Sequence, residues 1–384
     1  MKILQVVSSW KGGVIKVAFD VSRMLRELRH EVTIYITNLA FGNSNLDKKG
    51  DVKILSFNSL CSQIAKRVKV YITPRLIPRA REVRNFDIVH IHGYRTFQNG
   101  VIYYFVKKYE VPYILQAHGS LPRIMAKQSL KWLYDVLFGY RLLRDAAKVI
   151  ALSRVEAEQY RSMGIPEEKI AIIPNGIDLS EYAELPPKGV FKKKFNIPED
   201  RKIILYLGRI HRIKGIDFLV RAYAYLIKKT DLKDCILVIA GPDDGYMDKA
   251  IRLVNNLKII GSVLFTGMLT EKEKVSAYVD SSIVVNVEPR NVFGLVPLEA
   301  AACSTPVIVS KDNAISEVIC EGKFGFSIRY GDDIALAKTM EAILKDEEFA
   351  NEMGKRGREY IFAKFDWSKM VAKLEKVYEE VSRR

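Results

Sequence analysis

The segment from Ser281 to Ser310 constrains the fold of this chain more than any other stretch. Residues 283–287 are apolar and β-branched, which is typical of a short strand buried in a parallel sheet. Residues 288–292 are polar and include a proline, so they predict a loop, and a short helix is expected from Phe293, followed by a second strand. The order strand, loop, helix, strand indicates an α/β fold with a parallel sheet.

The expected helix start has the properties of an anion site. Phe293, Gly294 and Leu295 stand directly after the carboxyl end of a strand. N–H groups in the first helical turn lack intrahelical partners, and the helix dipole is positive there. Gly294 would let a ligand approach the backbone closely. Glu299 lies about one turn further along and leans back toward the helix start, within reach of a sugar hydroxyl beside the anion.

This segment resembles the signature of the retaining glycosyltransferases of family 4, also called glycosyltransferase group 1. In that family an acid is followed by x-Phe-Gly-Leu-x-x-x-Glu and then by Ala-x-Ala-x-Gly-x-Pro-Val. Phe293 to Leu295, Glu299 and residues 300–307 largely follow the pattern, but Asn291 stands in place of the first acid. Glu288 comes three residues too early to be a simple substitute. The resemblance implies the GT-B fold, in which two Rossmann-like, doubly wound α/β domains face each other across a cleft.

The first half of the chain adds two candidates to the resemblance. Gly12-Gly13 follow the first expected strand, where the family has a Gly-Gly loop facing the cleft, although the glycines could equally serve only the turn. They do not form G-x-G-x-x-G, which disfavours a nicotinamide-dependent dehydrogenase. His118 follows the expected strand 113–116 in a His-Gly context, where the family has a histidine beside the donor sugar. A histidine at a strand end can also be structural, and His90 and His92 are weaker candidates.

The second half repeats the α/β alternation from Lys202. Its first strand ends in Gly208-Arg209, and Lys214 completes a Gly-Arg-x4-Lys pattern that the family uses to hold the nucleotide diphosphate. Two fixed cations at a strand end can neutralise a pyrophosphate leaving group, so no metal is predicted. The family reads the nucleotide base near the loop that holds Gly267-Met268. The acidic pair Asp243-Asp244 follows Gly-Pro, where a turn or cap is a better interpretation than a metal site.

Charge is concentrated in the first half of the 384 residues. The net charge is +16, and residues 1–180 hold 28 Lys and Arg against 15 Asp and Glu, whereas residues 181–384 hold 33 against 30. An anionic membrane surface or a phosphorylated acceptor fits this excess, and so does a Lys-rich, thermophilic or archaeal composition. The run 66–84 has seven Lys and Arg against Glu82 alone, with interleaved apolar residues. It is either a lipid-contacting surface or a solvated basic face. No nucleic-acid-binding motif is present.

The four cysteines have no metal-like spacing, and no apolar run approaches the roughly 20 residues of a membrane helix. The apolar opening MKILQVV is too short for a signal peptide and predicts a buried strand. We therefore expect a cytoplasmic protein without disulfides, either free or peripheral on the inner membrane face.

These features predict two domains. Residues 1–185 would form an acceptor-binding domain, on which a C-terminal helix over residues 366–384 packs back, and residues 186–365 would bind the nucleotide sugar. The resemblance implies transfer of a hexose from a UDP- or GDP-linked sugar to a hydroxyl of a sugar, lipid-linked or phosphorylated acceptor, without a cofactor.

In that interpretation Arg209, Lys214 and the amides of residues 293–295 stabilise the diphosphate. Glu299 holds the ribose, and Asn291 and His118 contact the transferred sugar. Two alternatives stay open. One is a degenerate protein that binds a sugar nucleotide without turnover, which Asn291 makes conceivable. The other is a GT-B sugar-nucleotide epimerase.

Overall fold

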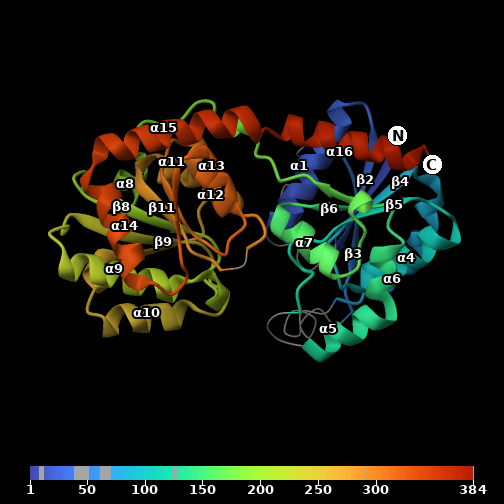
Figure 1. Cartoon of the computed structure of the whole chain (residues 1–384), viewed down its shortest axis with the longest axis horizontal. Helices are drawn as coiled ribbons and strands as arrows, with labels where there is room; N and C mark the ends of the chain where they lie inside the picture. The colour runs from blue at the N-terminus through green and yellow to red at the C-terminus, as the bar shows by residue number, and fades with distance from the viewer. Residues whose placement is uncertain (8–12, 39–51, 61–70, 124–127, 290, 384) are drawn as a thin grey trace. The chain divides into compact units, whose positions relative to one another are not determined.

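A computed structural model of the chain describes residues 1–7, 13–38, 52–60, 71–123, 128–289 and 291–383. The chain forms two compact units (Figure 1), one of Met1–Gly176 with Trp367–Arg384 and the other of Ile177–Asp366. The first unit ends before the expected boundary at residue 185. The reason is local: the 3-10 helix η5 (Leu179–Tyr182) contacts α12 (Leu295–Ala302) of the second unit, and the ring of Tyr182 is buried.

The first unit is built on a seven-stranded sheet in the order β3-β2-β1-β4-β5-β6-β7, and every neighbouring pair is parallel. The central strands are buried along almost their whole length, because helices cover both faces of the sheet. The strands are β1 (Lys2–Val7), β2 (Glu31–Asn38), β3 (Lys53–Asn58), β4 (Ile88–His92), β5 (Tyr113–Gln116), β6 (Lys148–Ala151) and β7 (Ile170–Ile172).

The helices of the first unit include the terminal helix α16, which contacts α1 and β4. They are α1 (Gly13–Glu27), α3 (Leu76–Arg79), η2 (Ala80–Asn85), α4 (Phe97–Lys108), α5 (Gln128–Tyr134), η3 (Asp135–Gly139), α6 (Tyr140–Arg144), α7 (Arg154–Ser162), η4 (Glu167–Lys169) and α16 (Trp367–Ser382).

The second unit has a six-stranded parallel sheet in the order β10-β9-β8-β11-β12-β13. Its strands are β8 (Lys202–Leu207), β9 (Cys235–Ala240), β10 (Val263–Gly267), β11 (Ser281–Asn286), β12 (Val307–Ser310) and β13 (Gly325–Ile328). Its further helices are α8 (Val190–Lys194), η6 (Arg212–Lys214), α9 (Ile216–Lys229), α10 (Met247–Asn256), η7 (Ile260–Ser262), α11 (Glu271–Asp280), α13 (Ile315–Gly322), α14 (Asp333–Lys345) and α15 (Glu347–Lys364).

Three local features differ from the sequence-based expectations. The helix expected from Phe293 begins at Leu295, because the backbone of Gly294 is extended, with φ −101° and ψ 133°. The helical segment 128–144 is divided into α5, η3 and α6, and η3 is a π-helical turn that the sequence pattern does not predict. The 18-residue helix α15 was not anticipated, since it lies among charged residues with a mixed periodicity.

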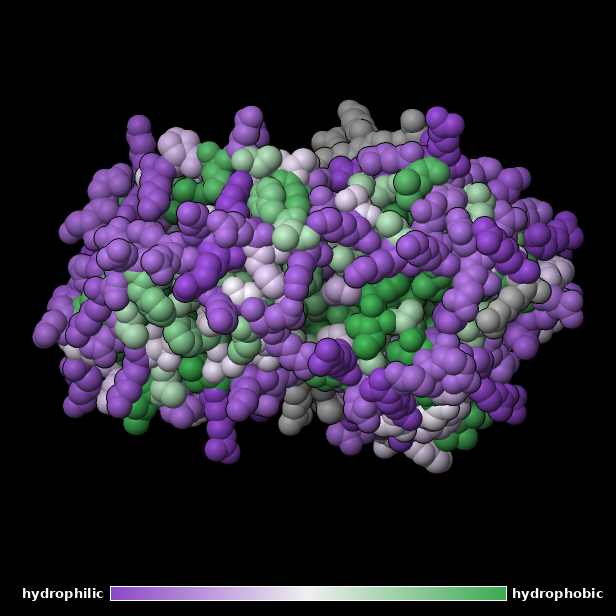
Figure 2. Space-filling model, turned by 45° about the horizontal axis from the view of Figure 1, so that its top comes forward, coloured by the Kyte–Doolittle hydropathy of each residue, from purple (hydrophilic) through white to green (hydrophobic). Residues whose placement is uncertain are grey.

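The face of the molecule drawn in Figure 2 is strongly hydrophilic. Figure 2 shows purple, hydrophilic side chains over most of the face in view, with hydrophobic residues in patches, as expected for a chain with net charge +16. Among the described residues, no helix combines the length and the apolarity that crossing a bilayer requires.

Candidate active site

The candidate site of the second unit lies at the carboxyl edge of its sheet, the edge where α/β proteins collect ligands. Strands β8 and β11 pair with each other, so the loops that follow them leave the sheet side by side. The loop after β8 carries Arg209 and Lys214, and the loop after β11 carries Glu288 and Asn291. Residues far apart in the sequence therefore meet at one point.

Glu288 is the centre of that meeting point. Its Oε2 atom accepts hydrogen bonds from Lys214 Nζ and, at 3.0 Å, from Asn291 Nδ2. The Lys214 side chain is 20% exposed and the Glu288 side chain 12% exposed, so the pair is largely withdrawn from water but still open to a ligand. The carboxylate that the sequence motif lacks at position 291 is therefore present beside Asn291 in space.

Gly215 makes this approach possible. Its backbone is left-handed, with φ 71°, and it caps the start of α9. A Cβ atom at this position would lie 2.7 Å from the carbonyl oxygen of Val287, the residue before Glu288. A side chain here would therefore push the Lys214 loop away from the Glu288 loop.

Arg209 occupies a more exposed position. Its guanidinium Nη1 donates to Asp244 Oδ2, and its carbonyl oxygen accepts from the Tyr206 hydroxyl at 2.9 Å. The Arg209 side chain is 46% exposed, so water and a ligand can reach it. The neighbouring Asp243 accepts from the amides of three residues at the start of α10, Gly245, Tyr246 and Met247. Asp243 thus stabilises the turn that leads into α10, in line with the turn interpretation.

The start of α12 is partly occupied by the chain itself. The Phe293 amide donates to Asn291 Oδ1 at 3.2 Å, and the Asn291 carbonyl accepts from the Ala314 amide at 2.8 Å. The predicted anion seat over Phe293 to Leu295 therefore narrows to the amides of Gly294 and Leu295. Asn291 links this helix start to Glu288, because its Oδ1 accepts from the Phe293 amide and its Nδ2 donates to Glu288.

Glu299 is buried in α12, only 4% exposed, and accepts a 2.7 Å hydrogen bond from the Tyr278 hydroxyl. Burial, with the Glu299 charge as the second cause, raises the pKa of the Tyr278 hydroxyl well above its usual value, so Tyr278 stays a donor.

Gly267 ends β10 in a left-handed conformation, and Met268 beside it is 78% exposed. Gly208 follows β8 directly, and its amide donates to the Ala240 carbonyl.

The first unit holds an array of three histidines: His90 and His92 lie buried in β4, and His118 follows β5 and is partly exposed. The rings of His90 and His92 stack at 4.0 Å, and those of His92 and His118 at 5.2 Å. His90 Nδ1 lies 2.7 Å from the Tyr378 hydroxyl of α16. His118 itself has an unusual left-handed backbone, with φ 50°. Burial lowers the pKa of His90 and of His118 to about 3, so both rings are neutral at pH 7.

The hydrogen bonds of this array fix the tautomer of His118. Gln5 Nε2 donates to the Tyr378 hydroxyl at 3.1 Å, so Gln5 Oε1 accepts from His92 Nε2 at 2.6 Å. Burial holds the pKa of His92 well below its usual value, so its Nδ1 carries a lone pair and accepts from His118 Nε2 at 2.9 Å. The Nδ1 atom of His118 is consequently an acceptor.

The remaining predicted positions carry less. Gly12 lies outside the described residues, and Gly13 is the exposed first residue of α1. Residues 66–70 of the basic run also lie outside, whereas its described part folds into α3 and η2, with Leu76 buried. Within the described ranges no cluster of three or more His, Cys, Asp or Glu side chains could hold a metal ion.

Sequence reasoning missed Gln5 and Tyr378, interpreted Asp244 only as part of a turn or cap, and set Glu288 aside. No local pattern marks the first two, since they lie at opposite ends of the chain. Asp244 and Glu288 could have been found from the loop positions alone, because each follows a strand adjacent to β8 in the sheet.

Known proteins match this chain along most of its length. The family model for glycosyltransferase family 4 matches residues 11–181, and the model for glycosyl transferases group 1 matches residues 188–360. N-acetyl-alpha-D-glucosaminyl L-malate synthase of Bacillus anthracis is 29% identical over 97% of this chain and 95% of its own length. D-inositol 3-phosphate glycosyltransferase of Kineococcus radiotolerans is 24% identical over 71% of this chain and 67% of its own length.

Solved structures agree on the fold. Sucrose-phosphate synthase from Thermosynechococcus elongatus aligns with a TM-score of 0.81 at 21% identity, covering 99% of this chain and 98% of that one. HepE of Anabaena in complex with UDP and glucose aligns with a TM-score of 0.80 at 18% identity, covering 99% and 100%.

Two parallel-sheet α/β units with these likenesses define a protein of the GT-B fold, as predicted. The two family models, which together match most of the chain, identify its family within this fold. The chain belongs to the group 1, family 4 glycosyltransferases.

Proposed function

We propose that this chain is a retaining hexosyltransferase that moves a hexose from a UDP- or GDP-linked sugar to a hydroxyl of an anionic acceptor. The observation that carries the proposal is the Lys214–Glu288–Asn291 cluster beside the start of α12. A fixed cation and free amides at a helix start are the groups that a leaving diphosphate needs.

The division of roles follows the chemistry of each residue. Arg209 and Lys214 would neutralise the diphosphate, exchanging their carboxylate partners Asp244 and Glu288 for phosphate oxygens. Glu288 and Asn291 would then bind hydroxyls of the donor sugar. His118 would accept a hydrogen bond from a sugar hydroxyl at Nδ1. No protein base is assigned, because the leaving diphosphate can itself take the acceptor's proton on the same face.

Names of relatives support the choice of substrates. HepE was solved with UDP and glucose, and the acceptors named for two curated relatives, L-malate and inositol 3-phosphate, are hydroxyl compounds with negative charge. An anionic acceptor also fits the excess of 28 Lys and Arg over 15 Asp and Glu in residues 1–180.

The first test is calorimetry with UDP, GDP, ADP and NAD. We expect one nucleoside diphosphate to bind, and Lys214→Ala or Arg209→Ala to weaken binding about tenfold or more, the value of one charge-assisted contact. Lys229→Ala removes the same charge from the far end of α9 and should leave binding unchanged. Equal binding by all variants would refute the diphosphate site.

The second test separates transfer from the alternatives. The bound nucleotide is supplied as its glucose, N-acetylglucosamine and mannose conjugates, with L-malate or inositol 3-phosphate as acceptor. A glycoside product supports the proposal, and its anomeric configuration decides retention. Tight binding without any product would favour the non-catalytic sugar-nucleotide binder, and an isomerised donor without product would favour the epimerase.

A further inference from the structure

The segment from Gln128 to Arg144 exposes an unusual amount of apolar surface. Six large apolar side chains along it are each between 45% and 53% exposed, and α5 buries no residue at all. They are Leu130, Trp132, Leu133, Val136, Leu137 and Phe138. A monomeric soluble protein rarely leaves so many neighbouring apolar side chains in water, so this ridge marks a contact surface.

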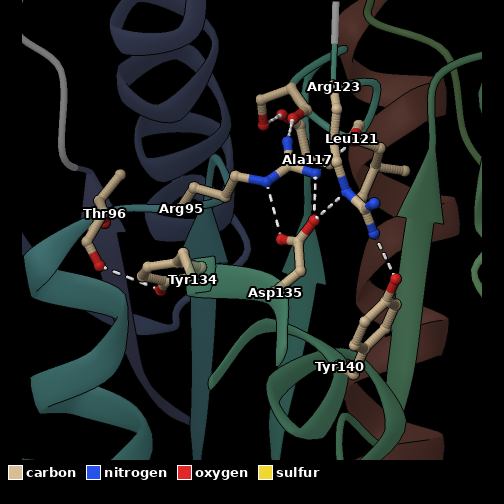
Figure 3. Close-up of polar contacts among 9 residues, drawn as sticks. Arg95, Thr96, Ala117, Leu121, Arg123, Tyr134, Asp135 and Tyr140 are labelled. Atoms are coloured by element: carbon tan, nitrogen blue, oxygen red, sulfur yellow. Dashed lines mark hydrogen bonds and ion pairs between the residues drawn. The ribbon is translucent and has the colours of Figure 1, made fainter. Parts of the chain in front are cut away.

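A buried ion-pair cluster around Asp135 anchors the ridge to the first unit (Figure 3). Asp135 is completely buried and sits between two guanidinium groups, with Arg95 Nε at 2.7 Å and Arg123 Nε at 2.8 Å. Although burial alone would raise it, hydrogen bonds from Arg95 and Arg123 hold the pKa of Asp135 below its usual value. The inner face is completed by Gly139, Leu142 and Leu143, which are buried.

The π-helical turn sets which face is turned outward. At Gly139 a Cβ atom would lie 2.2 Å from the hydroxyl of Tyr94, so only glycine lets the turn close on that ring. Asp135 is anchored on the inner side, and Val136, Leu137 and Phe138 consequently project outward from the same turn. Turns of this kind often occur at functional positions.

Basic side chains outnumber acidic ones along the ridge. The segment 128–144 contains Lys131, Arg141 and Arg144, of which Arg144 pairs with the neighbouring Asp145, and its one acid, Asp135, is buried. Asp135 with Arg95 and Arg123 forms a triad of net positive charge. Beside the ridge lies a hollow of about 420 Å³ lined by Arg123, Gln128, Ser129 and Trp132.

We propose that the ridge 128–144 docks the first unit on an anionic lipid bilayer. The apolar side chains would enter the boundary between headgroups and acyl chains, with Trp132 at the headgroup level, and a lipid phosphate would occupy the hollow beside Arg123. A second copy of the chain is a poorer occupant, since two such faces would bring like charges together. The ridge is a different segment from the basic run 66–84, which the sequence pattern offers as either a lipid-contacting surface or a solvated basic face.

The test uses the full chain and vesicles of phosphatidylcholine with or without phosphatidylglycerol, followed by flotation. We expect binding that requires phosphatidylglycerol and weakens with salt. Leu133→Glu and Leu137→Glu should each weaken vesicle binding about tenfold or more. Each change removes one leucine side chain that would be buried in the bilayer in the bound state. Ile260→Glu, at an equally exposed apolar residue of the second unit, should have no effect.

A second readout follows the tryptophan directly. In a Trp10→Phe background, brominated lipids should quench the emission of Trp132, and the further change Trp132→Phe should remove most of that quenching, because the third tryptophan, Trp367, is buried. Arg141→Gln keeps the apolar ridge and should weaken binding only to anionic vesicles. Absence of vesicle binding, or equal binding without phosphatidylglycerol, would overturn the proposal. So would a dimer in light scattering that Leu137→Glu dissociates.

Discussion

At the scale of single residues, the instructive position is Asn291. The family motif places a carboxylate there, and this chain has an amide whose Nδ2 donates to Glu288 and whose Oδ1 accepts from the Phe293 amide. In this chain a carboxylate stands three residues upstream of the motif position, where Glu288 contacts Lys214. The loss of the motif acid is therefore weaker evidence for an inactive protein than the sequence suggests.

This arrangement predicts that restoring the motif acid at position 291 lowers the activity of the enzyme. Asn291→Glu would put a second carboxylate beside Glu288, to which the Asn291 amide now donates, with one lysine to share, and two neighbouring like charges cannot both stay ionised without cost. We expect kcat/KM for sugar transfer to fall about tenfold or more, about 1.4 kcal/mol of transition-state stabilisation.

The matched control exchanges the two groups. The double variant Glu288→Gln with Asn291→Glu keeps one carboxylate and one amide, and it should recover part of the lost activity. Melting temperatures measured on all variants separate this effect from misfolding. An Asn291→Glu enzyme as active as the wild type, with every donor, would show that Glu288 does not stand in for the motif acid.

At the scale of elements, the site depends on how closely two loops approach. The η6–α9 junction touches the loop after β11 at Gly215, where a Cβ atom would lie 2.7 Å from the Val287 carbonyl. The geometry of the Lys214–Glu288–Asn291 cluster is therefore set by the backbone at Gly215 as much as by the side chains of Lys214 and Glu288.

Gly215→Ala is expected to destabilise the second unit by about 2 kcal/mol or more, from the strain of φ 71° and the steric clash together. Thermal melting measures it. Gly245→Ala is the control, because Gly245 also has positive φ, 87°, but has no atom within 4 Å of the added Cβ. If both variants melt alike, only backbone strain matters and the contact with Val287 has no special role.

At the scale of the whole molecule, the first and last segments of the chain are joined inside one unit. Gln5 of β1 and Tyr378 of α16 bond to each other and to the histidines His90 and His92 of β4. The tautomer of His118 is thus set by residues from both ends of the sequence. A break in the array at Tyr378 would be felt at His118 through two hydrogen-bonded neighbours.

The same array predicts acid sensitivity. The pKa values of His90 and His118 are lowered from 6.5 to about 3 in the folded chain, so between these values the unfolded state binds more protons. The contribution of these two histidines to stability is therefore fully present above about pH 6.5 and is lost as the pH falls toward 3. Urea unfolding at several pH values should show this loss. His118→Gln should make it shallower, by at most about 1.4 kcal/mol per pH unit; an unchanged slope would contradict the assignment.

Much of this protein could be predicted from local sequence. The buried β-branched runs, their alternation with helices and the Gly-Arg-x4-Lys and Phe293–Glu299 motifs were sufficient for the GT-B fold and the family, because each depends on residues close together in the chain. A parallel strand is fixed by its own apolar run and by the helix that follows it. The roles assigned to the motif residues follow from the resemblance and stay predictions.

Only the tertiary structure decided which side chains meet. By sequence spacing Glu288 comes too early to be a simple substitute for the motif acid, yet sheet order puts it against Lys214, because β8 and β11 are neighbours although they lie far apart in the chain. The tertiary structure likewise decided that Asp135 is buried between two arginines while its helical neighbours face outward. Local pattern determines what each element is, and the long-range pairing of elements determines which charges share a site.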